Sequence, residues 1–273
     1  MGGGLHSWDT GPEPSPVEVP PRRVVSLAPQ LTATLLDLDL GDRLIGVTDA
    51  CAAPAMGVQS WTRIGGGQQP AIDSIVALAP DLVLLDADDN RPQDADALRA
   101  AGLPVWILGP RTVFDTVNLL WDIMHVFDHA VMVPRVREIE RAAEYTQAAA
   151  TGTAPVRVFA PLVGGEWTTF NRETYAHDVL RACGGRNVFG GHAARFPTVT
   201  PGEVERAQPD VVLLPDEPAL FSDADIATIR ALEIPAAAHD RFYRLDRTLL
   251  TWYGTRLAYA LRDLPPLLAG DGE

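Results

Sequence analysis

The chain has 273 residues, of which 47% are hydrophobic, and it carries a formal net charge of −14 at pH 7. This length accommodates one large domain or two small ones, and the apolar content is ordinary for a globular protein. The acidic balance argues against a nucleic-acid partner, whose phosphates require a basic surface, and against docking on anionic lipid.

The first 21 residues are rich in glycine and proline. They lack the basic start and apolar stretch of a secretory signal peptide, and no later segment has the ~20 apolar residues of a membrane span. We therefore expect residues 1–21 to be a disordered leader. We also expect a cytoplasmic protein, or a periplasmic or extracellular one if a native leader was removed.

The first part of the chain alternates between strand and helix patterns. We expect strands at residues 22–27, 44–47, 82–86 and 104–108. We expect helices at residues 33–40, 72–78 and 94–101, with glycine stops at Gly41 and Gly102. The segments 28–32, 48–54 and 65–67 are expected to be turns or loops. This β-α-β-α order predicts a parallel sheet with helices on its faces.

The middle of the chain has a helical pattern instead. Apolar residues recur at spacings of four and three from Val113 to Val131, which is one face of a helix. Pro134 suits the first turn of a new helix, so a second helix is expected up to about Ala150. Such a helix spans about 25 Å, enough to bridge two domains as a stiff strut.

The alternation then resumes. We expect strands at residues 156–160 and 242–245, with another after the Pro-Asp turn at 209–210, and helices at 174–182, 203–207, 225–231 and 254–264. Gly184 and Gly185 are expected to stop the first of these helices.

One phrase occurs twice. Ala77-Leu-Ala-Pro-Asp-Leu-Val-Leu-Leu-Asp86 returns as Arg206-Ala-Gln-Pro-Asp-Val-Val-Leu-Leu-Pro-Asp216. Each copy reads as a helix end, a Pro-Asp turn and a strand buried on both faces. The repeat predicts two similar parallel-sheet α/β lobes with a ligand cleft between them. The expected division is a leader at 1–21, a lobe at 22–110, connecting backbone helices at 111–152, a lobe at 153–268, and a tail at 269–273.

Taken in order, these segments resemble the helical-backbone metal receptors, which are substrate-binding proteins of ABC importers. In the first lobe the markers are Arg23-Val-Val-Ser-Leu-Ala-Pro, Gly41-Asp-Arg-Leu-Ile-Gly-Val and Ile72-Asp-Ser-Ile-Val-Ala-Leu-Ala-Pro-Asp-Leu-Val. In the second lobe they are Val179-Leu-Arg-Ala-Cys-Gly-Gly-Arg-Asn-Val-Phe and Leu249-Leu-Thr-Trp-Tyr-Gly-Thr-Arg-Leu. The resemblance covers residues 22–268 and is strongest to the cobalamin-binding branch.

The resemblance implies a binding protein rather than an enzyme, with two lobes joined by a long rigid helix. It implies a metal chelate in the cleft, by preference a corrinoid such as cobalamin, with a siderophore or haem as other choices. It implies no resident cofactor, no metal site, no insertion in a membrane, and an ABC permease as a possible partner.

Loops that follow the carboxyl ends of parallel strands are the usual ligand-binding positions in such sheets. In the first lobe the candidates are Pro29, Gln30, Asp49, Gly66, Gly67, Gln68, Asp86 and Asp89. The glycines could let backbone amides approach a ligand, or they could form a plain flexible turn. The carboxylates of 86–90 form a solvated loop or contact a cationic ligand group, and they lack calcium-loop spacing.

In the second lobe the candidates are Phe170, Asn171, Arg195, Phe196, Trp252 and Tyr253. Aromatic rings suit the flat apolar face of a corrin or porphyrin. For Phe170 and Phe196 a place in the core is an equally good interpretation, whereas the pair at 252–253 favours the cleft.

Relatives in this family carry a glutamate in each lobe that pairs with permease arginines. Asp73 matches the first position with a shorter side chain, and Gly202 stands at the second, with Glu203 one residue away. Thr200-Pro-Gly-Glu203 is also a good capping box, so a structural role for Glu203 is favoured. The docking pair is weakened, which leaves open a ligand-binding module without a permease.

The sequence gives only weak signals for disulfide bonds, metal binding or catalysis. Cys51 and Cys183 are expected to be unbridged, because free cysteine behaves as a small hydrophobe. His125 and His129 have metal-binding spacing but no third ligand, so exposed helical residues are favoured. A chelatase-like cytoplasmic enzyme acting on a tetrapyrrole or metal is the alternative function. It would need a histidine facing a carboxylate, and only His192 is available.

Overall fold

The computed structural model describes residues 14–52, 61–215 and 221–269. The chain divides into two compact units. Unit 1 comprises the chain up to Pro110 together with Val117–Glu138, and unit 2 comprises Arg111–Thr116 together with the chain from Ile139 onward. Several expected segments lie outside the described residues, namely 1–13 of the leader, 53–54 of a loop, Asp216 of the repeat, and 270–273 of the tail. Residues 14–21 contain no helix or strand.

Unit 1 is built on a five-stranded sheet in the order β3-β2-β1-β6-β7, and every pairing in it is parallel. Its strands are β1 (Val24–Ser26), β2 (Leu44–Val47), β3 (Thr62–Arg63), β6 (Leu82–Asp86) and β7 (Val105–Leu108). Because the strands are parallel, the loops after them leave from one common edge.

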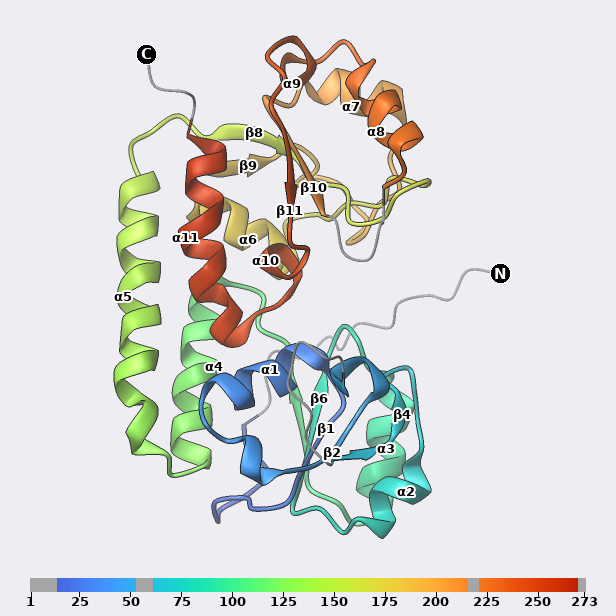
Figure 1. Ribbon diagram of the computed structural model, residues 1–273, viewed down its shortest axis with the longest axis vertical. Helices are drawn as coiled ribbons and strands as arrows, with labels where there is room; N and C mark the ends of the chain where they lie inside the picture. The colour runs from blue at the N-terminus through green and yellow to red at the C-terminus, as the bar shows by residue number, and fades with distance from the viewer. Residues whose placement is uncertain (1–13, 53–60, 216–220, 270–273) are drawn as a thin grey trace. The chain divides into compact units, whose positions relative to one another are not determined.

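Helices cover both faces of this sheet (Figure 1). They are α1 (Pro29–Asp37), α2 (Ile72–Ala77), α3 (Pro92–Ala100) and, from Val117 onward, α4 (Val113–Val126). Alternate strand residues such as Val83 and Leu85 pack with Ile75 of α2 and Leu98 of α3. The intervening residues are also buried, which explains why β6 reads as a continuous apolar run.

The first helix differs from its prediction. It begins at Pro29 rather than at residue 33, because proline is well suited to a first helical turn. It ends at Asp37, and the reversal is made by Asp39 at a φ of 56° rather than by Gly41. Aspartate tolerates this left-handed conformation better than most residues, so a glycine is not needed there.

Unit 2 contains a second parallel sheet in the order β11-β10-β8-β9. Its strands are β8 (Val156–Phe159), β9 (Gly185–Asn187), β10 (Val211–Pro215) and β11 (Phe242–Leu245). The helices are α6 (Tyr175–Ala182), α7 (Pro201–Ala207), α8 (Asp223–Arg230), α9 (Pro235–Ala238), α10 (Thr248–Thr251) and α11 (Leu257–Leu268). The predicted pair of parallel α/β sheets is thereby confirmed.

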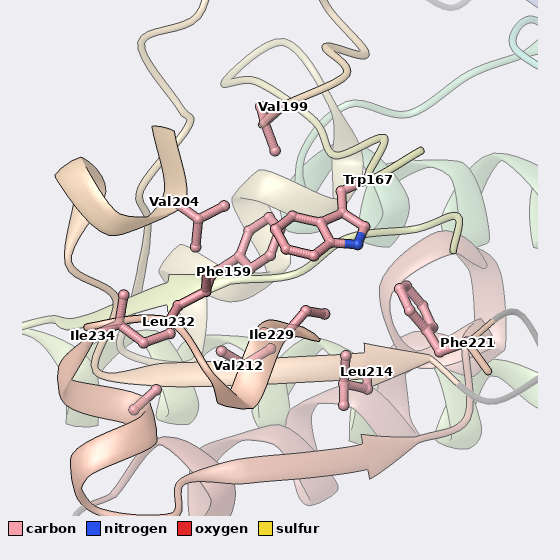
Figure 2. Close-up of a cluster of buried hydrophobic side chains, with 11 residues drawn as sticks. Phe159, Trp167, Val199, Val204, Val212, Leu214, Phe221, Ile229, Leu232 and Ile234 are labelled. Carbon is pink, nitrogen blue, oxygen red and sulfur yellow. The ribbon is translucent and has the colours of Figure 1, made fainter. Parts of the chain in front are cut away.

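One face of the second sheet is covered by a single aromatic and aliphatic core (Figure 2). Phe159 of β8 lies at its centre, with the ring of Trp167 at 6.1 Å and that of Phe189 at 5.6 Å between centroids. Val204 of α7 and Ile229 of α8 close the cluster from the helix side. Burial of these side chains fixes α7 and α8 against the sheet.

The boundary between the units runs through two continuous helices, α4 and α5 (Val133–Ala150). Pro134 is the second residue of α5, as the sequence predicts. His129, however, follows the end of α4 and is not on the same helix as His125. Asp128 breaks the helix between them with a φ of 48°.

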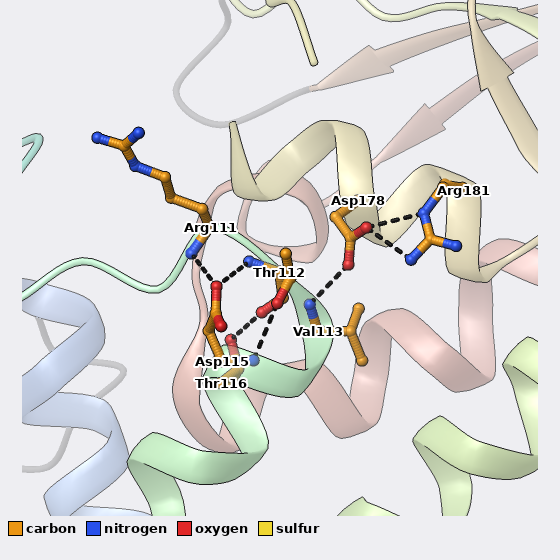
Figure 3. Close-up of polar contacts among 7 residues, drawn as sticks. All are labelled: Arg111, Thr112, Val113, Asp115, Thr116, Asp178 and Arg181. Atoms are coloured by element: carbon orange, nitrogen blue, oxygen red, sulfur yellow. Dashed lines mark hydrogen bonds and ion pairs between the residues drawn. The ribbon is translucent and has the colours of Figure 1, made fainter. Parts of the chain in front are cut away.

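The first turn of α4 is held inside unit 2 by a buried carboxylate (Figure 3). Asp178 of α6 accepts a hydrogen bond of 2.8 Å from the main-chain N–H of Val113 and pairs with Arg181 at 2.8 Å. Thr112 and Asp115 bond each other's main-chain N–H groups at 3.0 Å, which is a capping box. These contacts satisfy the unpaired donors that every helix start presents.

In both units, the aspartate of the repeated Pro-Asp turn binds main-chain N–H groups at the start of a neighbouring strand. Asp81 accepts from the main-chain N–H groups of Arg22 and Arg23 at 2.8 and 2.9 Å, beside the start of β1. Asp210 accepts from the main-chain N–H of Arg157 at 2.9 Å and binds its guanidinium, beside the start of β8. The residues before the two prolines, Ala79 and Gln208, both have left-handed backbones, with φ of 44° and 49°.

Candidate ligand-binding site

The carboxyl edge of the first sheet is organised by the loop after β6. Asp86 is only 2% exposed, and its Oδ1 accepts hydrogen bonds of 2.8 and 2.7 Å from the main-chain N–H groups of Asp88 and Asp89. The loop is therefore a structured turn, and its description as a solvated loop is wrong for Asp86. Asp88 and Asp89 remain exposed at its tip.

Asn90 joins this loop to two other segments. Its Oδ1 accepts from the N–H of Asp86 at 2.7 Å, and its Nδ2 donates to the carbonyl oxygens of Leu27 at 3.1 Å and Gly67 at 2.9 Å. The side chain thus connects the ends of β6 and β1 with the glycine-rich segment. Its role as this connector was not predicted, and no spacing in the sequence distinguishes it from an ordinary loop asparagine.

The glycine run forms a small antiparallel hairpin of β4 (Gly65–Gly66) and β5 (Gln69–Pro70) rather than a flexible turn. A Cβ at Gly67 would lie 3.2 Å from the carbonyl oxygen of Leu27 and 3.4 Å from Asn90 Nδ2. A Cβ at Gly66 would meet no atom within 4 Å. A side chain at Gly67 would therefore crowd these two groups, whereas Gly66 leaves an open backbone surface.

Two glutamines complete the cluster. Gln30, which is 3% exposed, donates from Nε2 to Asp89 Oδ2 at 2.9 Å. Gln68 donates from Nε2 to the main-chain oxygen of Asp89. The structure therefore brings together residues that the sequence predicts from three separate segments, namely Gln30, Gly67, Gln68, Asp86 and Asp89. Pro29 is half-buried at the start of α1, beside Gln30.

Asp49 lies after a different strand, β2, and its ion pair is made outside this cluster. Its carboxylate pairs with Arg63 at 3.8 Å, and both side chains are more than half exposed. An exposed pair at this distance contributes little to stability.

The carboxyl edge of the second sheet carries two adjacent segments. The main-chain N–H of Thr169 donates to the oxygen of Pro197, and that of Asn171 donates to the oxygen of Arg195, each at 2.9 Å. Asn171 is buried and donates from Nδ2 to the oxygen of His192 at 3.0 Å. Asn171, Arg195 and Phe196, predicted from separate loops, are therefore neighbours.

The aromatic candidates of unit 2 separate into two groups. Phe170 is completely buried, and its main-chain oxygen accepts from Asn187 Nδ2 at 2.7 Å. Tyr253 is 4% exposed and lies edge-on to Tyr175, at 6.2 Å between ring centroids. These two rings belong to the core of unit 2, which for Tyr253 corrects the prediction that it faces a cleft.

Phe196 and Trp252 are half-buried aromatic residues, so each keeps some exposed surface. The guanidinium of Arg195 lies 5.3 Å from the ring centre of Phe196, within cation–π distance. The indole of Trp252 stacks on no other aromatic ring in the described parts of the chain. Exposed ring faces of this kind are suitable for contact with a flat apolar ligand.

The two expected docking carboxylates have different surroundings. Asp73 is exposed in the first turn of α2. Glu203 accepts from the N–H of Thr200 at 2.8 Å and from its hydroxyl at 2.7 Å. The hydrogen bond from the Thr200 side chain is the main cause that lowers the pKa of Glu203. The predicted capping box at residues 200–203 is confirmed.

The cysteines and His192 do not form a reactive site together. Cys51 and Cys183 are buried free thiols, and burial raises the pKa of each. His192 accepts from the main-chain N–H of Ala194 through Nδ1 at 3.0 Å.

Within the described ranges, no three His, Cys, Asp or Glu side chains gather as a metal site. Those same ranges contain no helix with the length and apolarity needed to cross a bilayer.

Comparison with known proteins places the chain in one family. Residues 24–249 match the family described as periplasmic binding protein. A vitamin B12-binding protein of Vibrio parahaemolyticus is 27% identical over 228 residues, which are 83% of this chain and 82% of the relative.

Solved structures agree with the fold. The periplasmic vitamin B12 binding protein BtuF of Vibrio cholerae has a TM-score of 0.78 at 21% identity, covering 92% of this chain and 97% of that chain. The periplasmic heme-binding protein RhuT of Roseiflexus has a TM-score of 0.73 at 24% identity, covering 90% of this chain and 97% of that chain. The chain therefore belongs to the periplasmic binding protein family, and its predicted class, a substrate-binding protein rather than an enzyme, is confirmed.

Proposed function

We propose that this chain is the substrate-binding protein of an ABC importer and that it binds a metal chelate, by preference a corrinoid, at the carboxyl edges of its sheets. The observation that carries the proposal is a similarity to vitamin B12-binding proteins that is sustained over 83% of the chain. The two organised carboxyl edges support it, because ligands of open parallel sheets bind at such edges.

The proposed site uses the two edges differently. Unit 2 offers exposed ring surface at Phe196 and Trp252 for the apolar face of a macrocycle. Unit 1 offers the polar cluster around Asp89 for groups at the edge of a ligand. Phe170 and Tyr253 support these surfaces from the core and are left out of the contact surface.

Equilibrium titration tests this function. Purified protein is titrated with cyanocobalamin, haemin and a ferric siderophore, followed by tryptophan fluorescence and calorimetry. We expect saturable 1:1 binding of cyanocobalamin and weaker binding of the other two. Absence of binding by all three at high micromolar concentration would refute a metal-chelate receptor.

We also propose that Asp73 faces a permease. Its carboxylate is exposed at the start of α2, while that of Glu203 is engaged by Thr200. Ligand uptake is measured in cells that contain the permease and either the parent protein or Asp73→Ala. We expect reduced uptake with unchanged ligand affinity. Equal uptake by the two proteins would instead support a binding module that works without this contact.

A further inference from the structure

The side-chain amides of the polar cluster in unit 1 make most of their hydrogen bonds within the protein. Both glutamine amides already donate to Asp89, from Gln30 Nε2 to its carboxylate and from Gln68 Nε2 to its main-chain oxygen. Asn90 Nδ2 donates to two main-chain oxygens. Both N–H groups of Asn90 and one N–H group of each glutamine are therefore engaged within the protein.

One acceptor in the cluster is buried and unsatisfied. A carboxylate can only accept, so the nitrogen of Gln30 must face Asp89 and its oxygen must point elsewhere. That oxygen, Gln30 Oε1, is buried without a hydrogen-bond partner, in a side chain that is 3% exposed. A buried acceptor without a partner is unfavourable, and a donor supplied by a ligand would relieve this cost.

The tip of the loop after β6 is acidic. Asp88 and Asp89 are exposed at the tip of the loop. The neighbouring cations are already paired, Arg63 with Asp49 at 3.8 Å and Arg91 with Asp94 at 2.8 Å. A ligand group that meets this surface therefore encounters acceptors and negative charge.

We infer that the Gln30–Asp89 pair makes the site selective for chelates that present uncharged carboxamide N–H groups to unit 1, and against chelates that present carboxylates there. A carboxamide can donate to Gln30 Oε1 and to the Asp89 carboxylate, whereas a carboxylate can donate to neither and is repelled by the latter. This inference rests on the proposed function and adds the chemical class that the site prefers. It favours corrinoids, whose edges carry carboxamides, over haem, whose edge carries two carboxylates.

The test compares ligands that differ by one group. Cyanocobalamin is compared with each of its separated monocarboxylic acids, in which one peripheral carboxamide is hydrolysed, at pH 7.5 and low salt. We expect at least one acid to bind about 10-fold more weakly than the parent, because a carboxylate then lies near Asp89. In Asp89→Asn this penalty should fall to about 2-fold, since the charge is removed and a donor is added.

Two further variants serve as controls. Asp89→Glu keeps the charge and should keep the discrimination. Asp96→Asn makes the same charge change on the exposed surface of α3 and should leave the ratio at the parent value. Thermal melting of each variant verifies that it is folded.

The outcomes separate this inference from the proposed function. If every acid binds as tightly as cyanocobalamin, the inference is wrong while a corrinoid receptor stands. If haemin binds and no corrinoid does, the inference and the corrinoid preference both fail. If no chelate binds, the proposed function itself is wrong.

Discussion

At the scale of single residues, the conformation of the candidate site in unit 1 depends on Asn90. One side chain makes three hydrogen bonds of 2.7 to 3.1 Å to main-chain groups of three separate segments. Those main-chain groups are inside the protein, so loss of the side chain would leave them without partners. A buried polar group without a partner destabilises the folded state by more than its hydrogen bond stabilised it.

Asn90→Ala should therefore lower the free energy of unfolding by about 2–3 kcal/mol and weaken ligand binding. Chemical denaturation followed by circular dichroism measures the first effect, and titration measures the second. Asn118→Ala, an exposed asparagine on α4, is the control and should change stability by less than about 0.5 kcal/mol. Equal stability of the two variants would show that Asn90 does not hold the loop.

The residues before the two repeated prolines give a second prediction. Ala79 is strained at a φ of 44°, where only glycine is unhindered. Ala79→Gly should raise the free energy of unfolding by about 0.5–1 kcal/mol. The relief of backbone strain in the folded state should outweigh the greater entropy that glycine gives the unfolded chain.

Gln208 is the matched position, with a φ of 49°. Its Nε2 donates to the main-chain oxygens of Glu205 at 2.7 Å and Glu233 at 2.8 Å. Gln208→Gly loses both bonds and should give no gain in denaturation experiments. A stabilisation of the same size at both positions would contradict this account.

At the scale of elements, the Pro-Asp turn fixes the start of a neighbouring strand in each unit. Asp210 holds Arg157 of β8 through three hydrogen bonds, at 2.9 Å to the main-chain N–H and at 3.1 and 2.7 Å to the guanidinium. The side-chain bond from Arg157 is the largest cause that lowers the pKa of Asp210. The folded protein therefore binds this proton less readily than the unfolded chain does.

This difference predicts a dependence of stability on pH. The contribution of Asp210 is present above the ordinary carboxyl pKa of about 4 and is lost as the pH falls through the lower pKa of the folded protein. Asp210→Asn should be less stable by about 1 kcal/mol at pH 7, after allowance for partial exposure, and should approach the parent at low pH. Denaturation curves from pH 7 to pH 2 measure this, and parallel curves for the two proteins would contradict it.

The apolar content and the length of an element decide whether it can be predicted from the sequence. The predicted strands at 44–47 and 242–245 match the observed bounds. The first is an apolar run between turn residues, which has few other interpretations. β9 was missed because its residues, Gly185 to Asn187, include no large apolar side chain. α9 and α10, with four residues each, are too short to show a helical period.

At the scale of the whole molecule, the repeated phrase predicts a pair of sheets, and the pair is present as β6 and β10 in separate sheets. A single merged sheet would have contradicted that prediction. The candidate site was less predictable, because loops after strands can be identified from sequence while the direction of each side chain cannot. Phe170 and Tyr253 illustrate this limit, since their burial depends on packing within unit 2.

The central claim is that the carboxyl edges of the two sheets form the ligand-binding surfaces. Hydrogen–deuterium exchange of the full chain, with and without saturating cyanocobalamin, tests it most directly. The account predicts slower exchange on binding at residues 66–68 and 86–90 of unit 1, and at residues 195–197 and 252–253 of unit 2. Protection confined to one unit, or located away from both edges, would contradict it.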